Sequence, residues 1–246
     1  MSKKAIIFGL LVLFFAWAVV ALVVDKPMVP APWVVIYSFF ADLPRGLGWH
    51  ALVSGWRIIA SMFIATAIGL PLGLVLGQNR RWDKILYPLV YLTYPVPKVA
   101  LLPIIILFFG IGDASKIFLI SLILFFQVLV VVRDASRNIP AQLVLSLRSL
   151  GADRWQLLRH VYFPASLPAV LTSLRLNVAI AIAVLYLAES FATASGLGYY
   201  VMDAWQRMDY ARMYATVGAM SLIGFIAFVI LALMEDKLCH WAQVGK

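Results

Sequence analysis

Residues 133–164 read RDASRNIPAQLVLSLRSLGADRWQLLRHVYFP and stand between two long apolar stretches of the chain. Apolar residues recur at helical spacing on both sides of Gly151, as Leu143, Leu147 and Leu150 before it and Trp155, Leu158 and Tyr162 after it. This spacing predicts two short amphipathic helices that meet at a glycine. Such a pair lies outside the hydrocarbon, either passively on lipid headgroups or against a protein partner.

The rest of the chain has the composition of an integral membrane protein. Apolar residues make up 64% of the 246 residues, and charged residues only 13%. A span takes about 20 apolar residues, so this length accommodates roughly five to seven transmembrane helices with short connections. The composition therefore predicts an all-α membrane domain and excludes a separate soluble domain.

Six apolar runs are long enough to be spans, and they cover residues 5–24, 52–76, 85–109, 117–132, 167–188 and 214–234. The segment 33–40 is too short to cross and is rich in aromatic residues, which predicts an interfacial segment. We therefore expect about six transmembrane helices, with an N-terminal helix and interfacial segment over 1–48 and a membrane core over 49–246.

Two of these spans have unusual features. The run 85–109 contains four prolines, so it cannot form one straight helix, and broken backbone at membrane depth needs a protein or water lining. The run 52–76 contains Gly69 and Gly73, and Gly77 follows directly after it. These glycines stand at intervals of four, which lets another helix approach closely. We favour packing inside one subunit over a dimer seam for this glycine face.

The net charge of +9 is informative mainly through its distribution over the loops. Basic residues concentrate in one set of loops, at 3–4, 80–84, 133–159 and the C-terminus, and are sparse in the other. The positive-inside rule then predicts a multi-pass protein with both termini and the 133–164 segment in the cytoplasm. We expect lipid, not nucleic acid, to account for the charge.

Residues 145–164 resemble the cytoplasmic signature loop of binding-protein-dependent ABC importer permeases, written Glu-Ala-Ala, three residues, Gly, nine residues, Ile, one residue, Leu-Pro. Gly151 and Pro164 match, and Val161 and Phe163 occupy the hydrophobic positions. Leu145 stands where the family has its glutamate. The stretches YPVPKVALLPIIILFFGIGDASK and AESFATASGLGYYV resemble the nitrate, sulfonate and taurine branch of these permeases.

The resemblance implies the type I ABC importer permease fold, with a coupling-helix loop at about 138–164. It implies a homodimer of this chain, two cytoplasmic ATPase subunits that bind ATP and Mg, and an extracytoplasmic solute-binding protein. The implied coupling residues are Leu147, Arg148, Leu150, Gly151, Ala152, Asp153, Arg154, Trp155 and Pro164. Leu147, Leu150 and Trp155 would be apolar anchors, and Arg148, Asp153 and Arg154 would be rim contacts.

Ionisable and polar groups inside or beside the spans are the candidates for the translocation pathway. Lys98, between Pro95, Pro97 and an apolar run, either lines the pathway as a cation for an anionic solute, or snorkels or pairs with Glu189. Glu189, Ser190 and Thr193 precede a glycine-rich stretch that forms either an outer gate or an exposed loop.

The sequence offers no catalytic or metal-binding constellation. It lacks a G-x-x-x-x-G-K-[ST] phosphate loop, and its three histidines are isolated. We therefore expect no catalytic residue, no metal and no cofactor in this chain, with ATP hydrolysis in a separate subunit. The expected cargo is a sulfonate, nitrate, taurine or related nutrient; the alternatives are a neutral or aromatic vitamin precursor, or a carrier or channel that works without ATP.

Overall fold

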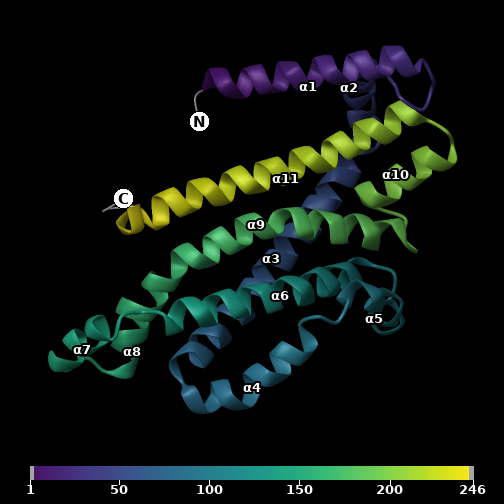
Figure 1. Cartoon of the computed structure of the whole chain (residues 1–246). Helices are drawn as coiled ribbons and strands as arrows, with labels where there is room; N and C mark the ends of the chain where they lie inside the picture. The colour runs from purple at the N-terminus through teal and green to yellow at the C-terminus, as the bar shows by residue number, and fades with distance from the viewer. Residues whose placement is uncertain (1–2, 244–246) are drawn as a thin grey trace. The chain divides into compact units, whose positions relative to one another are not determined.

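The computed structural model describes residues 3–243, and no β-strand occurs among them. Figure 1 shows the helices in chain order. The chain divides into two compact units, Met1–Gly55 with Tyr186–Ile223, and Trp56–Leu185 with Gly224–Lys246. The predicted division at residue 48 does not coincide with this grouping. The reason is that the N-terminal segment packs with residues 186–223 and does not form a unit by itself.

The first unit contains α1 (Lys3–Val24), α2 (Pro32–Asp42), η1 (Leu43–Arg45) and α10 (Leu197–Gln206), together with one end of α3 (Leu47–Gln78), α9 (Phe163–Ser190) and α11 (Tyr210–Leu238). The predicted interfacial segment is α2, which begins at Pro32 because proline fits the first turn of a helix. Tyr200 of α10 donates a hydrogen bond to Asp42 at 2.7 Å, and Arg212 pairs with the same carboxylate at 3.1 Å. Burial and the Asp42 carboxylate raise the pKa of Tyr200 to about 12, so the phenol remains a donor.

The second unit contains α4 (Arg80–Thr93), η2 (Lys98–Leu101), α5 (Leu102–Phe109), α6 (Asp113–Arg137), α7 (Ala141–Ser149), α8 (Arg154–Leu157), η4 (His240–Gln243) and the remaining parts of α3, α9 and α11. A π-helical turn, Leu158–Tyr162, joins α8 to α9. The two short helices predicted around Gly151 are therefore only half right. The helix before the glycine is short, but the one after it is the start of a continuous helix, Arg154–Ser190.

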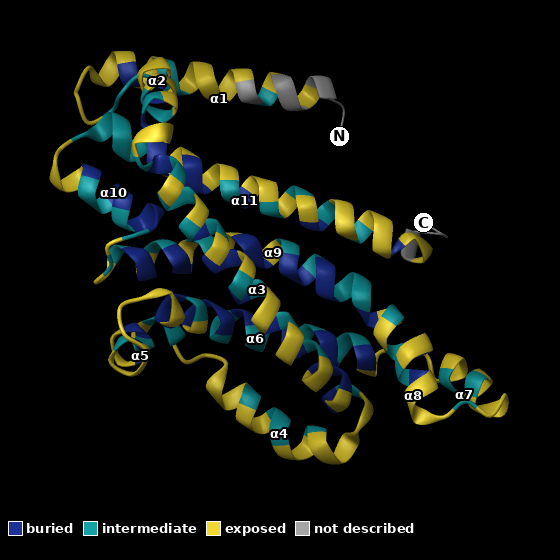
Figure 2. Ribbon diagram, turned by 180° about the vertical axis from the view of Figure 1, so that it is seen from behind, coloured by how far each residue is buried: buried dark blue, intermediate teal, exposed yellow. Residues whose placement is uncertain are grey.

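The core of the second unit lies where α6 and α9 pack together with α3 and α11. Its buried residues are Leu74, Val128, Val132, Val170, Leu174, Val178 and Leu231. Figure 2 shows buried residues along α6 and α9, whereas α4 and α11 are largely exposed. The exposed side chains are mostly large and apolar, as expected for helices that face lipid.

The glycine face of α3 packs inside this unit. A Cβ atom built on Gly73 would lie 2.7 Å from Cβ of Val132, and one built on Gly77 would lie 2.6 Å from the carbonyl oxygen of Arg133. These distances are far below van der Waals contact, so the backbones of α3 and α6 meet with no side chain between them. The packing that the sequence favours for these glycines is confirmed.

Within residues 3–243, four helices are long and apolar enough to cross a membrane: Leu47–Gln78, Asp113–Arg137, Arg154–Ser190 and Tyr210–Leu238. A fifth candidate is the pair Arg80–Thr93 and Lys98–Phe109, which is bent by 80° at its break. This bend confirms that the proline-rich span is not one straight helix. The expected number of six is approximate, since the apolar part of α1, Leu11–Val24, is shorter than a full span.

An ion pair holds the start of α4 against the end of α6. Arg133 binds both carboxylate oxygens of Asp83, at 2.7 and 2.8 Å, and its guanidinium lies 3.6 Å from the ring centre of Tyr87. Both charged side chains are largely buried. A bidentate pair at low exposure fixes the relative position of two helices more firmly than a surface pair does.

We expect Asp83→Asn to lower the free energy of unfolding by about 2–3 kcal/mol, because it leaves the buried Arg133 without its bidentate partner. Thermal unfolding of the purified protein in detergent measures this loss. Asp134→Asn is the matched control: Asp134 pairs with the same arginine at 2.6 Å but is half exposed, so its loss should have a smaller effect. Equal effects of the two variants would contradict the prediction.

Candidate functional site

The turn after α7 is a Schellman motif centred on Gly151. The amide of Ala152 donates to the carbonyl of Leu147 at 3.1 Å, and the amide of Gly151 donates to that of Arg148 at 2.9 Å. Gly151 has φ +85°, in the left-handed region that a residue with a side chain adopts at a cost. The glycine therefore ends α7 and turns the chain sharply toward α8.

The helix that follows begins with a capping box. The carboxylate of Asp153 accepts from the amide of Gln156 at 2.7 Å, and the Gln156 side chain accepts from the amide of Asp153 at 2.8 Å. Asp153 therefore caps α8, a structural role that the sequence interpretation as a rim contact did not include. With the Schellman motif it makes the whole connection between the two helices a hydrogen-bonded, compact turn.

Two apolar side chains project from this turn into open space. Leu150 is 86% exposed and Trp155 is 67% exposed, whereas Leu147 is half buried and contributes to the turn itself. Arg148 and Arg154 are exposed beside them, Ala152 and Pro164 are half buried, and a Cβ atom on Gly151 would meet nothing within 4 Å. The turn is thus a rigid knob with two unpartnered apolar residues at its surface.

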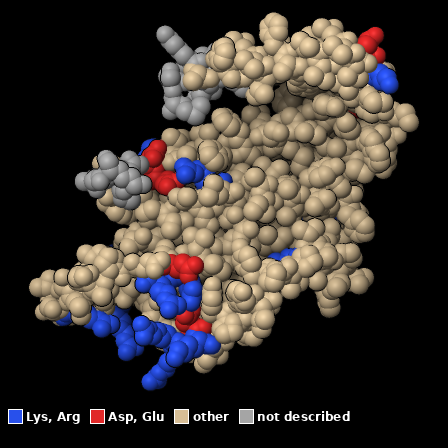
Figure 3. All heavy atoms as spheres, in the orientation of Figure 1, with Lys and Arg blue, Asp and Glu red and all other residues tan. Residues whose placement is uncertain are grey.

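A basic cavity lies beside the knob. Its volume is about 800 Å³, and its lining includes Arg80 and Arg81 at the start of α4 together with Arg148 and Arg154. Figure 3 shows that Lys and Arg side chains gather where α4 begins and where α7 and α8 lie. This end of the second unit is the one that the charge distribution assigns to the cytoplasm.

The break in the proline-rich span places Lys98 at the end of α4. Its ammonium donates to the carbonyl oxygens of Thr93 and Tyr94, at 3.1 and 2.9 Å, and lies 4.5 Å from the ring centre of Phe126. The carbonyl of Thr93 also accepts from the amide of Val96 at 3.2 Å, and the lysine adds a charged donor at this helix end. Pro95 and Pro97 lie exposed in the intervening turn. Lys98 also lines a cavity of about 230 Å³ together with Tyr94 and Gln127.

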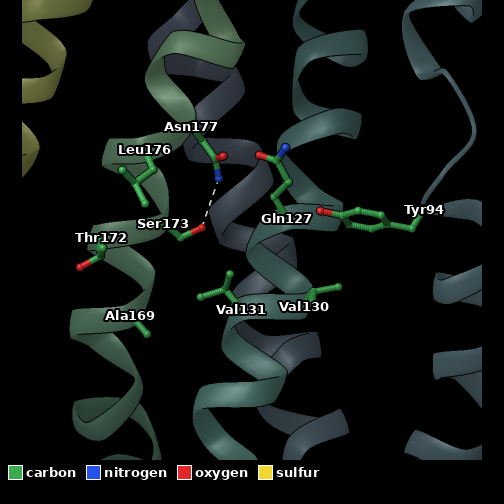
Figure 4. A pocket seen from close by; sticks show the side chains of 9 residues that line it. All are labelled: Tyr94, Gln127, Val130, Val131, Ala169, Thr172, Ser173, Leu176 and Asn177. Atoms are coloured by element: carbon green, nitrogen blue, oxygen red, sulfur yellow. Dashed lines mark hydrogen bonds between the residues drawn. The ribbon is translucent and has the colours of Figure 1, made fainter.

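A second cavity, of about 480 Å³, lies between α6, α9 and Tyr94 (Figure 4). Its polar lining consists of Tyr94, Gln127, Thr172, Ser173 and Asn177. Neutral hydrogen-bonding groups in otherwise apolar spans are functional candidates, and Gln127 and Asn177 stand out in this way in LILFFQVLVVV and SLRLNVAI. Neither residue is among the pathway candidates predicted from the sequence, which are Lys98, Glu189, Ser190 and Thr193 with Pro95 and Pro97.

Of the predicted pathway residues of the first unit, Glu189 is buried, and Ser190 and Thr193 are half buried. Glu189 accepts from Ser54 Oγ at 2.8 and 2.9 Å and from the amide of Gly198 at 2.9 Å, and it is fully buried. Ser190 donates to the carbonyl of Tyr186, and Thr193 to that of Ser195. The sequence leaves an outer gate and an exposed loop as alternatives for this stretch. The structure adds a third, because Glu189 and Gly198 form a packed, hydrogen-bonded end of α9. No three His, Cys, Asp or Glu side chains within residues 3–243 are grouped to hold a metal.

The family model of the binding-protein-dependent transport system inner membrane component matches residues 69–239. The chain is 31% identical over 232 residues to the taurine transport system permease protein TauC of Escherichia coli (strain K12), covering 92% of this chain and 84% of that protein. It is 31% identical over 215 residues to the riboflavin transport system permease protein RibX of Chloroflexus aurantiacus, covering 87% and 80%.

The fold is similar to that of a solved transporter. A chain of the MetNI methionine ABC transporter, in an inward-facing conformation, superposes with a TM-score of 0.67 over 80% of this chain and 98% of that one, at 18% sequence identity. Together with the apolar helices, the broken span and the rigid turn at Gly151, the family match is decisive. The chain belongs to the family of binding-protein-dependent transport system inner membrane components and is a multi-pass permease subunit of an ABC importer.

Proposed function

We propose that the knob, the turn between α7 and α8, docks into a groove of a cytoplasmic ATPase subunit, which binds ATP and Mg and drives transport. The exposure of Leu150 and Trp155 on a turn fixed by two capping motifs carries this proposal. Exposed apolar residues on a rigid support are typical anchors of a protein interface. Because α8 continues into α9, a displacement of the knob would be transmitted along a continuous helix.

We further propose that both termini and the knob face the cytoplasm and that two copies of this chain enclose the pathway. The charge distribution supports the orientation. The second copy is supported by the cavity between α6 and α9, where Tyr94 is 47% exposed and Leu176 is 66% exposed. A cavity that opens at the surface of one chain needs another wall to enclose a solute, and a symmetric partner is the simplest source of one.

The proposed cargo is a small sulfonate or related oxyanion delivered by an extracytoplasmic binding protein. The similarity to the taurine permease TauC and the position of Lys98 in the cavity lining support this class. A neutral aromatic solute is the second candidate. The similarity to the riboflavin permease RibX favours it, as do the aromatic rings and neutral amide groups that line the cavities of about 480 and 230 Å³.

The test is ATP hydrolysis by the complex purified in lipid from cells that co-express this chain and a candidate ATPase. We expect the ATPase to co-purify and its turnover to rise when a binding protein loaded with taurine or an alkanesulfonate is added. A rise with a riboflavin-loaded protein alone would select the second candidate. Absence of a stable ATPase partner would contradict the docking role of the knob.

A further inference from the structure

We propose that this permease carries its own cargo-recognition site, which reads a short solute with an anionic group at one end and an ammonium group at the other. The site consists of the two cavities that share Tyr94 and Gln127 in their linings. The inference rests on the proposed transport function and narrows its cargo from sulfonates in general to amino-substituted ones.

The anionic end of the solute belongs at Lys98. An ammonium has three N–H donors, and Lys98 uses two of them on the carbonyls of Thr93 and Tyr94. The third remains for an oxyanion in the smaller cavity. Among the described residues that line the two cavities, Lys98 alone is charged, so an anion meets no repelling carboxylate there.

The ammonium end belongs between two amide oxygens. Gln127 Oε1 is buried and has no hydrogen-bond partner in the described part of the chain, which is costly unless a donor arrives. Across the larger cavity the Asn177 amide nitrogen donates to Ser173 Oγ at 3.2 Å, and Figure 4 shows the amide groups of Gln127 and Asn177 directed toward each other. An N–H donor between them satisfies the orphaned oxygen of Gln127.

The remaining walls are apolar and suit an aliphatic linker between the two charged groups. They consist of Val99, Ile123, Val130, Val131, Ile180 and Val184. Thr172, the other hydroxyl of the larger cavity, donates to Glu235 at 2.7 Å, and Glu235 pairs with Arg175 at 3.2 Å. Those groups are engaged with one another, so the two amides, Ser173 and the Tyr94 hydroxyl are the polar groups that face the cargo.

The experiment compares taurine, ethanesulfonate and ethylamine as ligands of the purified permease–ATPase complex in lipid discs, without a binding protein. A ligand that binds the folded state raises the thermal unfolding temperature in proportion to its occupancy. We expect taurine to raise it at lower concentrations than ethanesulfonate, and ethylamine to have the weakest effect. Equal responses to taurine and ethanesulfonate, or no response to either, would overturn the proposal.

Gln127→Met keeps the length of the side chain and removes the acceptor. We expect it to raise the half-saturating concentration of taurine about tenfold, as the loss of a hydrogen bond to a charged group does, and to leave that of ethanesulfonate unchanged. Gln206→Met, the same change at the exposed end of α10, is the control and should change neither value. A Gln127→Met variant that weakens both ligands equally would show a structural role only.

These measurements distinguish a failure of the cargo-recognition site from a failure of the proposed transport function. If ATP hydrolysis rises with a loaded binding protein while the discs show no preference for taurine, selection resides in the binding protein and only this inference fails. If no ATPase associates, the same thermal series is measured on the permease alone. A preference for taurine that depends on Gln127 then supports the site although the docking role is lost.

Discussion

Gly73→Leu is expected to abolish folding of the permease, with no monodisperse protein recovered from membranes. The Cβ atom alone would lie 2.7 Å from Val132 Cβ and 2.9 Å from the carbonyl oxygen of Leu129, which belongs to the backbone of α6. A leucine forces the helices apart and disrupts the adjacent packing of Leu74 and Val132. We estimate a loss of more than about 3 kcal/mol, a large part of the stability of a typical domain.

Gly55→Leu is the matched control, since it places the same side chain in the same helix. A Cβ atom on Gly55 would meet nothing within 4 Å, so the variant should be recovered at the level of the wild type. Size-exclusion chromatography in detergent after equal expression measures both variants. Recovery of folded Gly73→Leu protein would show that α3 and α6 can separate and that the glycine face has another purpose.

The helical regions were predictable because apolar runs of about 20 residues and clusters of proline report directly on spans and breaks. The packing of the α3 glycines was equally predictable, because their spacing of four predicts a helix face without side chains and the structure places α6 against that face. The sequence does not indicate where a helix ends when apolar or amphipathic residues continue without a break. Residues 154–162 have the pattern of a short surface helix, yet a π-helical turn lets them continue into α9.

The site was predictable where one residue has one structural requirement, as at Gly151, whose positive φ follows from its position between two apolar stripes. It was less predictable where a polar residue has a choice of partners. Asp153 and Lys98 both have charges that suggest external partners, but the chain uses them to cap α8 and α4. Gln127 Oε1 is buried without a hydrogen-bond partner among residues 3–243, and that fact emerges only from three-dimensional packing.

Gly151→Trp is expected to reduce ATP hydrolysis stimulated by the loaded binding protein at least tenfold, while the permease still folds. The left-handed φ of +85° makes any side chain cost about 1–2 kcal/mol, and no atom lies within 4 Å of the new Cβ, so the variant is strained but not blocked. The indole projects beside Leu150 and Trp155, where it holds the knob away from the groove of the ATPase. Stimulated hydrolysis and solute uptake in proteoliposomes measure the loss.

Gly110→Trp separates loss of docking from backbone strain. Gly110 also has a positive φ, +76°, and its Cβ position is equally open, but it ends α5 at a distance in sequence from the knob. The ψ of −178° at Gly110 belongs to a region that only glycine adopts readily, so if strain alone were responsible, Gly110→Trp would lose at least as much activity as Gly151→Trp. Gly151→Asn adds a second comparison, because asparagine tolerates the left-handed region and is much smaller than tryptophan. Activity that falls from glycine through asparagine to tryptophan at position 151, with Gly110→Trp unaffected, means that the surface of the turn, and not its backbone alone, couples the two subunits. Undiminished uptake by Gly151→Trp would remove the knob from the coupling mechanism.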